Sequence, residues 1–204
     1  MMIFAVSCKD TPNEVDAMDA ETEAMASDAA VTYNVDTDAS IINWEGSKVG
    51  GMHTGTIDIQ SGMVMVNGEN VESGEFTIDM NSIAVTDLEG ESAMSLKAHL
   101  EGTAEGKATD FFNTPEYPTA KFVVTGLNGN TLEGNLTLKD ITKNVSFPVN
   151  VSYDGDRMML TSEEFTIDRT DWGIVYGSTT LADTVKDKAI SDDMTLKVNL
   201  VATK

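Results

Sequence analysis

The stretch GEFTIDM, residues 74–80, decides the fold of this chain. Apolar and polar side chains alternate along it without a break, which is the period of a β-strand, because successive strand residues point to opposite faces. Phe76, Ile78 and Met80 therefore share one face, and the two acids and the threonine between them share the other. One face suits a dry interior and the other suits water.

The same alternation recurs along most of the chain after residue 30. Leu132, Leu136 and Leu138 share a face with Gly134, and longer alternating runs lie at 145–153 and 194–202. Weaker segments complete the set. The segments predicted as strands are 33–36, 41–45, 54–60, 63–67, 74–80, 121–127, 132–138, 145–153, 158–168 and 194–202.

Local irregularities add detail to this pattern. Leu160 and Phe165 are an odd number of residues apart, so the strand at 158–168 needs a bulge near 162–164 for both to face the same way. Pro148 lies inside a strong strand, which predicts an edge, a bulge or a position whose amide the ladder does not need. Three dipeptides typical of hairpin turns separate strands: Asn67-Gly68, Asn128-Gly129 and Asp154-Gly155.

One segment has the period of a helix. Within residues 91–101, Ala93, Leu96 and Leu100 form an apolar stripe, and Gly102 can end the helix. A second helical turn is predicted within 180–190. Many antiparallel strands with one or two short helices are typical of a β-sandwich or a β-barrel.

The alternate faces of the strands are polar, which decides the direction of the apolar faces. A membrane barrel turns apolar residues outward to lipid, whereas here the apolar face must point inward, as in a water-soluble barrel. An eight-stranded barrel either fills its interior or holds one small ligand. Met80, Met194 and one of Met63 and Met65 are expected inside, where flexible thioethers suit a variable apolar guest or simply fill gaps.

Charge and motifs exclude several classes of protein. The chain carries 34 acidic and 13 basic side chains, a formal charge of −21. Nucleic acids and anionic lipid surfaces both need clustered Lys and Arg, so we expect neither as a partner. His53 and His99 are the two histidines, and no catalytic or metal-binding motif accompanies them. The sequence predicts a binding protein without enzymatic activity, metal or cofactor.

The N-terminal residues suggest a lipid anchor. Cys8 is the sole cysteine, and the sequence AVSC, residues 5–8, resembles a bacterial lipobox. We expect residues 1–8 to be a truncated lipoprotein signal, residues 9–30 an acidic disordered tether, and residues 31–204 the barrel. Lipidation of Cys8 would attach the protein to a membrane; the alternative is an incidental cysteine in a disordered N-terminus.

Several segments, in order, resemble the YceI-like family of periplasmic polyisoprenoid-binding proteins. They are VDTDASIINWEGS (35–47), HTGTI (53–57), GEFTIDMNSIAVTD (74–87), His99-Leu100, DFFNTPEYPTAKF (110–122), LEGNLTLKDITKNVSFPVNV (132–151) and FTIDRTDWGI (165–174). The resemblance spans roughly residues 33–204. It implies an all-β, extended eight-stranded antiparallel lipocalin-like barrel with one or two short outer helices. It also implies an apolar tunnel that takes an isoprenoid or fatty chain.

The resemblance and the alternation together supply candidate residues. Phe111, Phe112 and Trp172 are candidates to close the barrel or to line its mouth. His53 and Arg169 are candidates to contact a polar head group, with a hydrogen-bonding role and a structural ion pair as the alternatives. The candidates for the tunnel lining are Phe76, Ile78, Met80, Phe122, Val124, Leu136, Leu138, Val145, Phe147, Val149, Phe165, Ile167, Leu196 and Val198.

We therefore expect a protein that binds, sequesters or carries a polyisoprenoid, an isoprenoid quinone or a fatty acyl compound. We expect it in the cell envelope of a Gram-negative-type bacterium, in the periplasm and anchored through lipidated Cys8, with surface display left open. The alternative is a barrel filled by its own side chains that acts as a stress-related or surface interaction module. The sequence does not determine the oligomeric state, and a homodimer is one of the alternatives.

Overall fold

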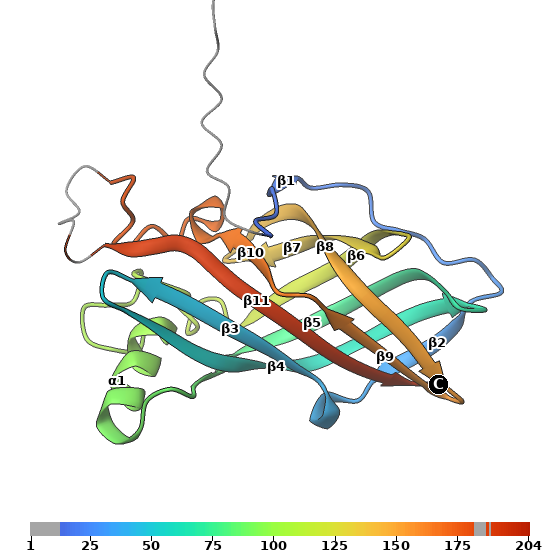
Figure 1. Cartoon of the computed structure of the whole chain (residues 1–204), viewed down its shortest axis with the longest axis horizontal. Helices are drawn as coiled ribbons and strands as arrows, with labels where there is room; N and C mark the ends of the chain where they lie inside the picture. Colours follow the sequence, from blue (N-terminus) through green and yellow to red (C-terminus); the bar gives the residue numbers. More distant parts are fainter. Residues whose placement is uncertain (1–12, 182–186, 188) are drawn as a thin grey trace, which may run out of the picture.

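Eight long antiparallel strands form a closed ring in the computed structural model, which describes residues 13–181, 187 and 189–204 (Figure 1). The ring order is β3-β4-β5-β6-β7-β8-β9-β11, and β11 closes it by pairing with both β3 and β9. The strands are β1 Met18–Asp19, β2 Val31–Val35, β3 Ile41–Lys48, β4 Gly51–Asn67, β5 Asn70–Val85, β6 Thr119–Asn128, β7 Thr131–Leu138, β8 Ile141–Asp154, β9 Arg157–Ser162, β10 Phe165–Asp168 and β11 Ile190–Thr203. The predicted mainly β, eight-stranded antiparallel barrel is confirmed.

The alternating faces point as the sequence predicts, except along β4. Phe76, Ile78 and Met80 are buried in β5. The predicted strands 54–60 and 63–67 are instead one strand, β4, whose register shifts between Ile59 and Ser61. The extra residue exchanges the two faces, so Val64 and Val66 point inward, while Met63 is 48% exposed. The expectation of Met63 or Met65 inside was therefore wrong.

The predicted bulge at 162–164 is present as a break between two strands. β9 ends at Ser162 and β10 begins at Phe165. Both pair with β11, β9 along residues 199–203 and β10 along 193–196. Because two residues separate the strands, Leu160 and Phe165 are both buried in the core.

The predicted helix covers one end of the barrel. α1, Gly90–Glu101, ends at Gly102, whose φ of 77° is the left-handed conformation that glycine adopts at helix C-termini. Leu100, in the last turn of α1, is buried in the core. The amides of Phe112 and Thr114 donate to the carbonyls of Leu100 and Glu101 at 3.0 and 2.8 Å. Among the described residues, no helix is long and apolar enough to cross a membrane.

Two short 3-10 helices complete the described secondary structure, η1 Thr37–Ala39 and η2 Arg169–Trp172. The second helical turn predicted within 180–190 falls largely on residues 182–186 and 188, which lie outside the described residues. Cys8 and the lipobox also lie outside them, so their role stays a prediction.

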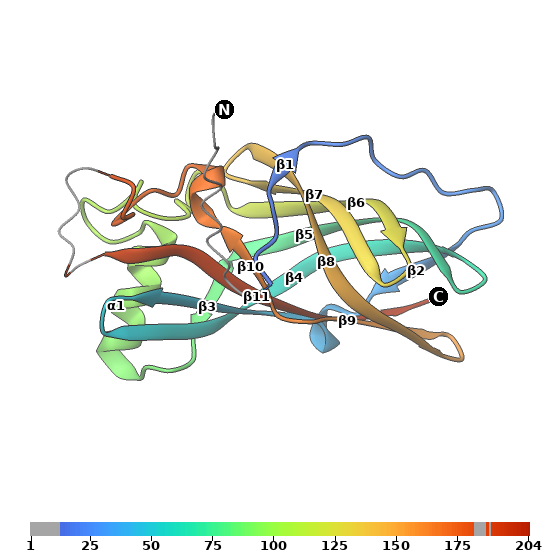
Figure 2. The same ribbon diagram turned by 45° about the horizontal axis from the view of Figure 1, so that its top comes forward.

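Residues 13–30, which we call the strap, lie along the barrel wall, mostly exposed to water, and do not form the disordered tether that their composition predicts (Figure 2). Met18 and Asp19 pair with Asn144 and Lys143 of β8. Further along, the Nδ2 of Asn135 donates to the carbonyl of Glu21 at 2.7 Å. Backbone hydrogen bonds that composition does not reveal therefore order this acidic segment.

Gly134 leaves space inside the barrel for an aromatic ring. It lies on the inward face of β7, opposite Val124 of β6. A Cβ atom at this position would lie 2.2 Å from the ring of Phe122. The ring can therefore lie against the wall at this point only because residue 134 has no side chain.

We expect Gly134→Ala to lower the free energy of unfolding by about 1–3 kcal/mol, because the ring of Phe122 must move into an already packed interior. Urea unfolding measures the change. Gly126→Ala is the matched control, since its Cβ would meet nothing nearer than Oε2 of Glu133 at 3.4 Å. The double variant Gly134→Ala/Phe122→Leu should recover part of the loss, and equal losses with and without Phe122 would contradict this account.

Candidate functional site

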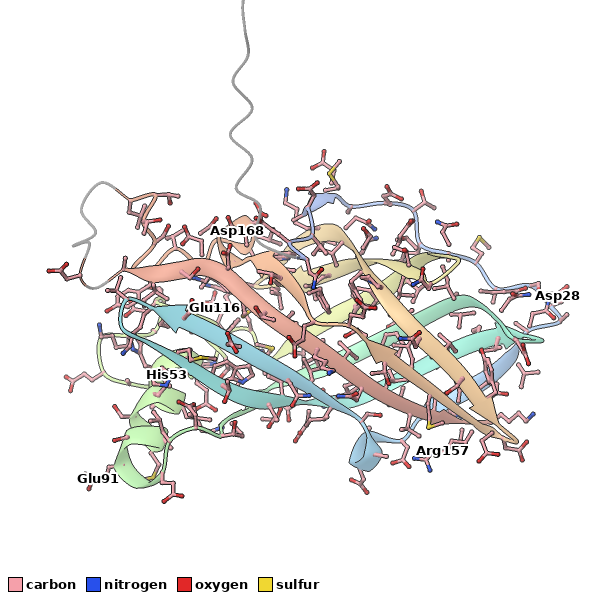
Figure 3. The ribbon with its side chains drawn as sticks, in the orientation of Figure 1. Asp28, His53, Glu91, Glu116, Arg157 and Asp168 are labelled. Atoms are coloured by element: carbon pink, nitrogen blue, oxygen red, sulfur yellow. The ribbon has the colours of Figure 1, made fainter. Side chains whose placement is uncertain are left out.

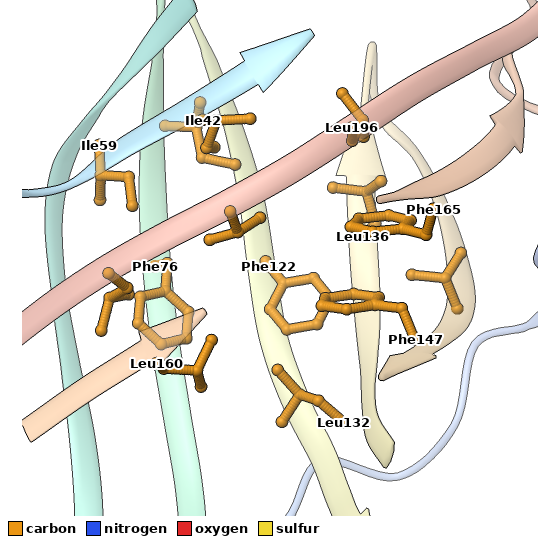
Figure 4. A pocket seen from close by; sticks show the side chains of 14 residues that line it. Ile42, Ile59, Phe76, Phe122, Leu132, Leu136, Phe147, Leu160, Phe165 and Leu196 are labelled. Atoms are coloured by element: carbon orange, nitrogen blue, oxygen red, sulfur yellow. The ribbon is translucent and has the colours of Figure 1, made fainter. Parts of the chain in front are cut away.

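A cavity inside the barrel is lined by apolar side chains (Figure 4). Its volume is about 80 Å³. Four phenylalanine rings from β5, β6, β8 and β10 border it, and the rings of Phe147 and Phe165 are stacked with centroids 4.0 Å apart. The lining residues are Ile42, Ile59, Phe76, Ile78, Phe122, Leu132, Leu136, Val145, Phe147, Leu160, Phe165, Leu196, Val198 and Leu200.

Most of the predicted lining residues border this inner cavity, namely Phe76, Ile78, Phe122, Leu136, Val145, Phe147, Phe165, Leu196 and Val198. Met80 and Leu138 border a separate cavity of about 10 Å³ beside Phe112. Val124, Val149 and Ile167 are buried in the core and border neither. Alternation identifies the inward face of a strand, but it does not tell which level of the barrel a residue occupies.

Five residues of the lining were not predicted: Ile42, Ile59, Leu132, Leu160 and Leu200. Leu132 and Leu200 belong to alternating faces that were recognised in the sequence, so that signal was available. Ile42 and Ile59 lie in strands with weak alternation, and Leu160 precedes the break between β9 and β10. Their place on the cavity depends on strand pairing.

A second apolar cavity, of about 60 Å³, lies nearer to α1. β11 contributes Met194 to this cavity and Leu196 to the inner one. β4 likewise contributes Ile57 to the second cavity and Ile59 to the inner one. The two cavities therefore follow one another along the lumen.

An open pocket of about 390 Å³ forms the mouth of the barrel beyond the second cavity. Trp44, Leu100 and Phe111 border both and separate them. The ring of Trp44 lies over Gly55, where a Cβ atom would come within 2.5 Å of it. The indole N–H is buried without a hydrogen-bond partner among the described residues.

Both histidines of the chain border this mouth pocket, each beside a carboxylate. Nδ1 of His53 lies 2.8 Å from Oδ2 of Asp87, and Nε2 of His99 lies 2.8 Å from Oδ2 of Asp110. His53 lies at the end of the barrel that α1 covers (Figure 3). The mouth thus combines polar groups with an apolar floor.

Aromatic rings form one wall of the mouth pocket. The ring of His99 meets those of Phe111 and Tyr176 edge-on, with centroids 5.0 and 5.1 Å apart. Nζ of Lys107 lies 4.9 Å above the ring of Tyr176 and 3.2 Å from Oδ2 of Asp110. These contacts fix the loop after α1 against the barrel.

The predicted closure residues lie at this end of the barrel. Phe111 borders the mouth and the second cavity, and Phe112 borders the second cavity from beneath α1. Trp172 is fully buried, and its Nε1 donates to the carbonyl of Leu136 at 3.1 Å. Trp172 borders neither of the two inner cavities nor the mouth pocket, so its position supports closure.

Arg169 borders the second cavity, but its donors are directed into the protein. Its Nη2 lies 3.3 Å from Oδ1 of Asp192, and its Nε donates to the carbonyl of Ser191 at 2.9 Å. Burial lowers the pKa of Arg169, whereas Asp192 and Asp168 raise it. This arrangement supports the structural ion pair, and the head-group contact stays a prediction.

A closed antiparallel ring with an apolar lumen, a polar-rimmed mouth and one outer helix defines the lipocalin-like class of barrel. The sequence profile described as the YceI-like domain matches residues 33–202. The chain therefore belongs to the YceI-like family. No curated protein matches the sequence.

Two solved structures have the same fold. The crystal structure of BcnA from Burkholderia cenocepacia is 25% identical, with 83% of this chain and 99% of that chain covered and a TM-score of 0.59. A polyisoprenoid-binding domain from Saccharophagus degradans, described as implicated in plant cell wall breakdown, is 19% identical, with 84% and 97% covered and a TM-score of 0.60. The similarity to the Saccharophagus degradans domain establishes only that the two chains share a fold.

Removal of Asp192 should be costly because it leaves a buried guanidinium without its counter-charge. We expect Asp192→Ala to lower the free energy of unfolding by about 3–5 kcal/mol. Asp156→Ala, which breaks the exposed pair with Lys204, should cost less than about 1 kcal/mol. Urea unfolding of both variants checks the contrast, and equal effects would be evidence against a structural role for Arg169.

The mouth should respond to acid through Asp87. The amide of Thr54, donating at 2.9 Å, and then His53 lower the pKa of Asp87 from its ordinary 3.8. The stability that this carboxylate contributes is therefore present above pH 3.8 and is lost as the pH falls through the lowered pKa. Asp87→Asn should reduce the Tm at neutral pH, and the gap to the wild type should close in acid. Glu105→Gln, in an exposed loop, is the control, and a gap that widens in acid would contradict this assignment.

Proposed function

We propose that this protein binds one long apolar chain in the lumen of its barrel. The observation that carries the proposal is the lining of the inner cavity, where every bordering side chain is apolar in a protein whose formal charge is −21. The inner cavity offers no group for proton transfer or nucleophilic attack. It suits a ligand recognised by burial, so we propose binding without catalysis.

The physical gain from such binding is large. Each methylene group removed from water contributes about 0.8 kcal/mol. A polyisoprenoid, an isoprenoid quinone or a fatty acyl chain therefore needs an apolar carrier to cross an aqueous compartment. Family membership supports this proposal, as does the description of one structural neighbour as a polyisoprenoid-binding domain.

The ligand must widen the lumen as it enters. The enclosed cavities measure about 80 and 60 Å³, whereas ligand pockets usually span about 300–1,000 Å³. The mouth pocket supplies additional space of about 390 Å³. We therefore propose that a bound chain displaces the phenylalanine rings of the lumen, while its polar end lies in the mouth near His53.

The cellular setting is a further part of the proposal. The lipobox-like AVSC sequence supports lipidation at Cys8 and attachment to a membrane of the cell envelope, facing the periplasm or the outside. Two acyl chains would hold such an anchor stably. Fractionation of cells that express the wild type and Cys8→Ser tests this point, since the variant should leave the membrane fraction.

The small enclosed volumes favour one second candidate. If the stacked rings of Phe147 and Phe165 stay in place, the barrel is filled by its own side chains and functions as an interaction module. Binding of an apolar chain requires these rings to move, whereas a role as an interaction module does not.

Titration with cis-parinaric acid, a fluorescent fatty acid, separates the two candidates. We expect saturable binding at one chain per protein, and native mass spectrometry of the purified protein should show an apolar passenger that organic solvent extracts. Val198→Phe should weaken the binding by on the order of tenfold, because the added ring occupies the lumen.

Asn199→Phe is the matched control, because the neighbouring residue faces the opposite side of β11 and should leave the binding unchanged. Circular dichroism confirms that both variants fold. A wild type without a passenger and without saturable binding would favour the self-filled module.

A further inference from the structure

The barrel wall has a seam between β8 and β10. β9 pairs with residues 149–154 of β8, but β10 forms no backbone hydrogen bond with residues 141–148 in the described part of the chain. On the inner side of this seam, the stacked rings of Phe147 and Phe165 meet, with centroids 4.0 Å apart. Both rings border the inner cavity. The seam therefore leads directly to the lumen.

Pro148 marks the edge of the seam. The amide of Val149 donates to Asn130 on the β7 side at 2.7 Å. Because successive amides of a strand point to opposite sides, the nitrogen of Pro148 faces away from β7 and towards the seam. A proline there leaves no unpaired donor at the strand edge.

The strap covers the seam from outside. Thr166 of β10 donates to the carbonyl of Asn13 at 3.0 Å and accepts from the amide of Val15 at 2.8 Å. Met18 and Asp19 then pair with β8. The first residues of the strap thus bridge two strands that do not bridge each other (Figure 2).

The contact between the strap and β10 is short, because its backbone hydrogen bonds all go to Thr166. No strap side chain is fully buried, and Val15 and Ala17 are its only residues packed against the core among those described. Loss of surrounding water, Asp168 and then Asp16 raise the pKa of Asp171 in η2, whereas Lys143 lowers it, so Asp16 lies near one like charge just after β10. The rest of the strap is held by the β1 ladder with β8 and by the hydrogen bonds between Glu21 and Asn135 of β7, while Asp19, at 3.8 Å from Lys143, is fully exposed.

Few buried contacts and exposed backbone hydrogen bonds characterise segments that open without global unfolding. The route through the mouth is also obstructed, since Trp44, Leu100 and Phe111 are all buried in the core. We propose that the seam is a side portal, through which an apolar chain enters the lumen when residues 13–17 detach from β10. This inference rests on the proposed binding of an apolar chain.

A disulfide that pins the strap to β10 tests the portal. In a Cys8→Ser background, Glu14→Cys/Thr166→Cys joins paired residues of the strap and β10, which lie at a spacing that a disulfide spans. Asp19→Cys/Lys143→Cys joins paired residues of the strap and β8 and is the matched control. The readout is the rate of cis-parinaric acid uptake from phosphatidylcholine vesicles.

We expect the oxidised Glu14/Thr166 staple to slow uptake by on the order of tenfold, with reduction restoring the rate. The Asp19/Lys143 staple should leave the rate unchanged. Val15→Pro, which removes the amide that bonds to Thr166, should accelerate uptake. Equal rates in oxidised and reduced Glu14/Thr166 protein would overturn the portal.

Gly46→Phe tests the other route, because Gly46 borders both the second cavity and the mouth pocket. Slower uptake in this variant, with no effect of the Glu14/Thr166 staple, would assign entry to the mouth and overturn the portal. Failure of every form, the wild type included, to bind cis-parinaric acid would instead count against the proposed function.

Discussion

The hydrogen-bonded ladder of β11 is the interaction on which the rest of the structure depends. This strand pairs with β3 and β2 along one edge and with β9 and β10 along the other. It therefore converts an open sheet, with two rows of unpaired amides and carbonyls, into a ring. Once the ring is closed, every inward side chain faces other side chains across one lumen, and that lumen stays dry because the inward positions are apolar.

The free space in the lumen depends on two places where a large aromatic ring packs over a glycine. The ring of Phe122 lies over Gly134, and the ring of Trp44 lies over Gly55. Each ring lies against the barrel wall at a position where the neighbouring strand has a glycine and therefore no Cβ atom. The remaining volume is two small cavities in sequence below an open mouth. A barrel of this kind can hold a thin chain only by moving rings, which ties ligand capacity to the rotamers of a few phenylalanines.

Some features could be predicted because they arise from neighbouring residues. The inward face of β5, the helix ending at Gly102 and the break near residue 163 all follow from local periodicity or turn chemistry. The faces of β4 beyond Ile59 were not predicted, because a bulge between Ile59 and Ser61 exchanges them. The strap was not predicted either, since its bonds to Asn135 and Thr166 join residues more than a hundred positions apart.

The sequence by itself determined that the strands are two-faced and that the apolar faces must meet, because a period of two is a local property of the chain. It also determined the family, through motifs that stand in order. Only the tertiary structure decided which inward residues border a cavity, which strand edge lacks a partner, and which segment covers it. Those outcomes depend on register and on axial position around a closed ring, and both are set by pairings between distant segments.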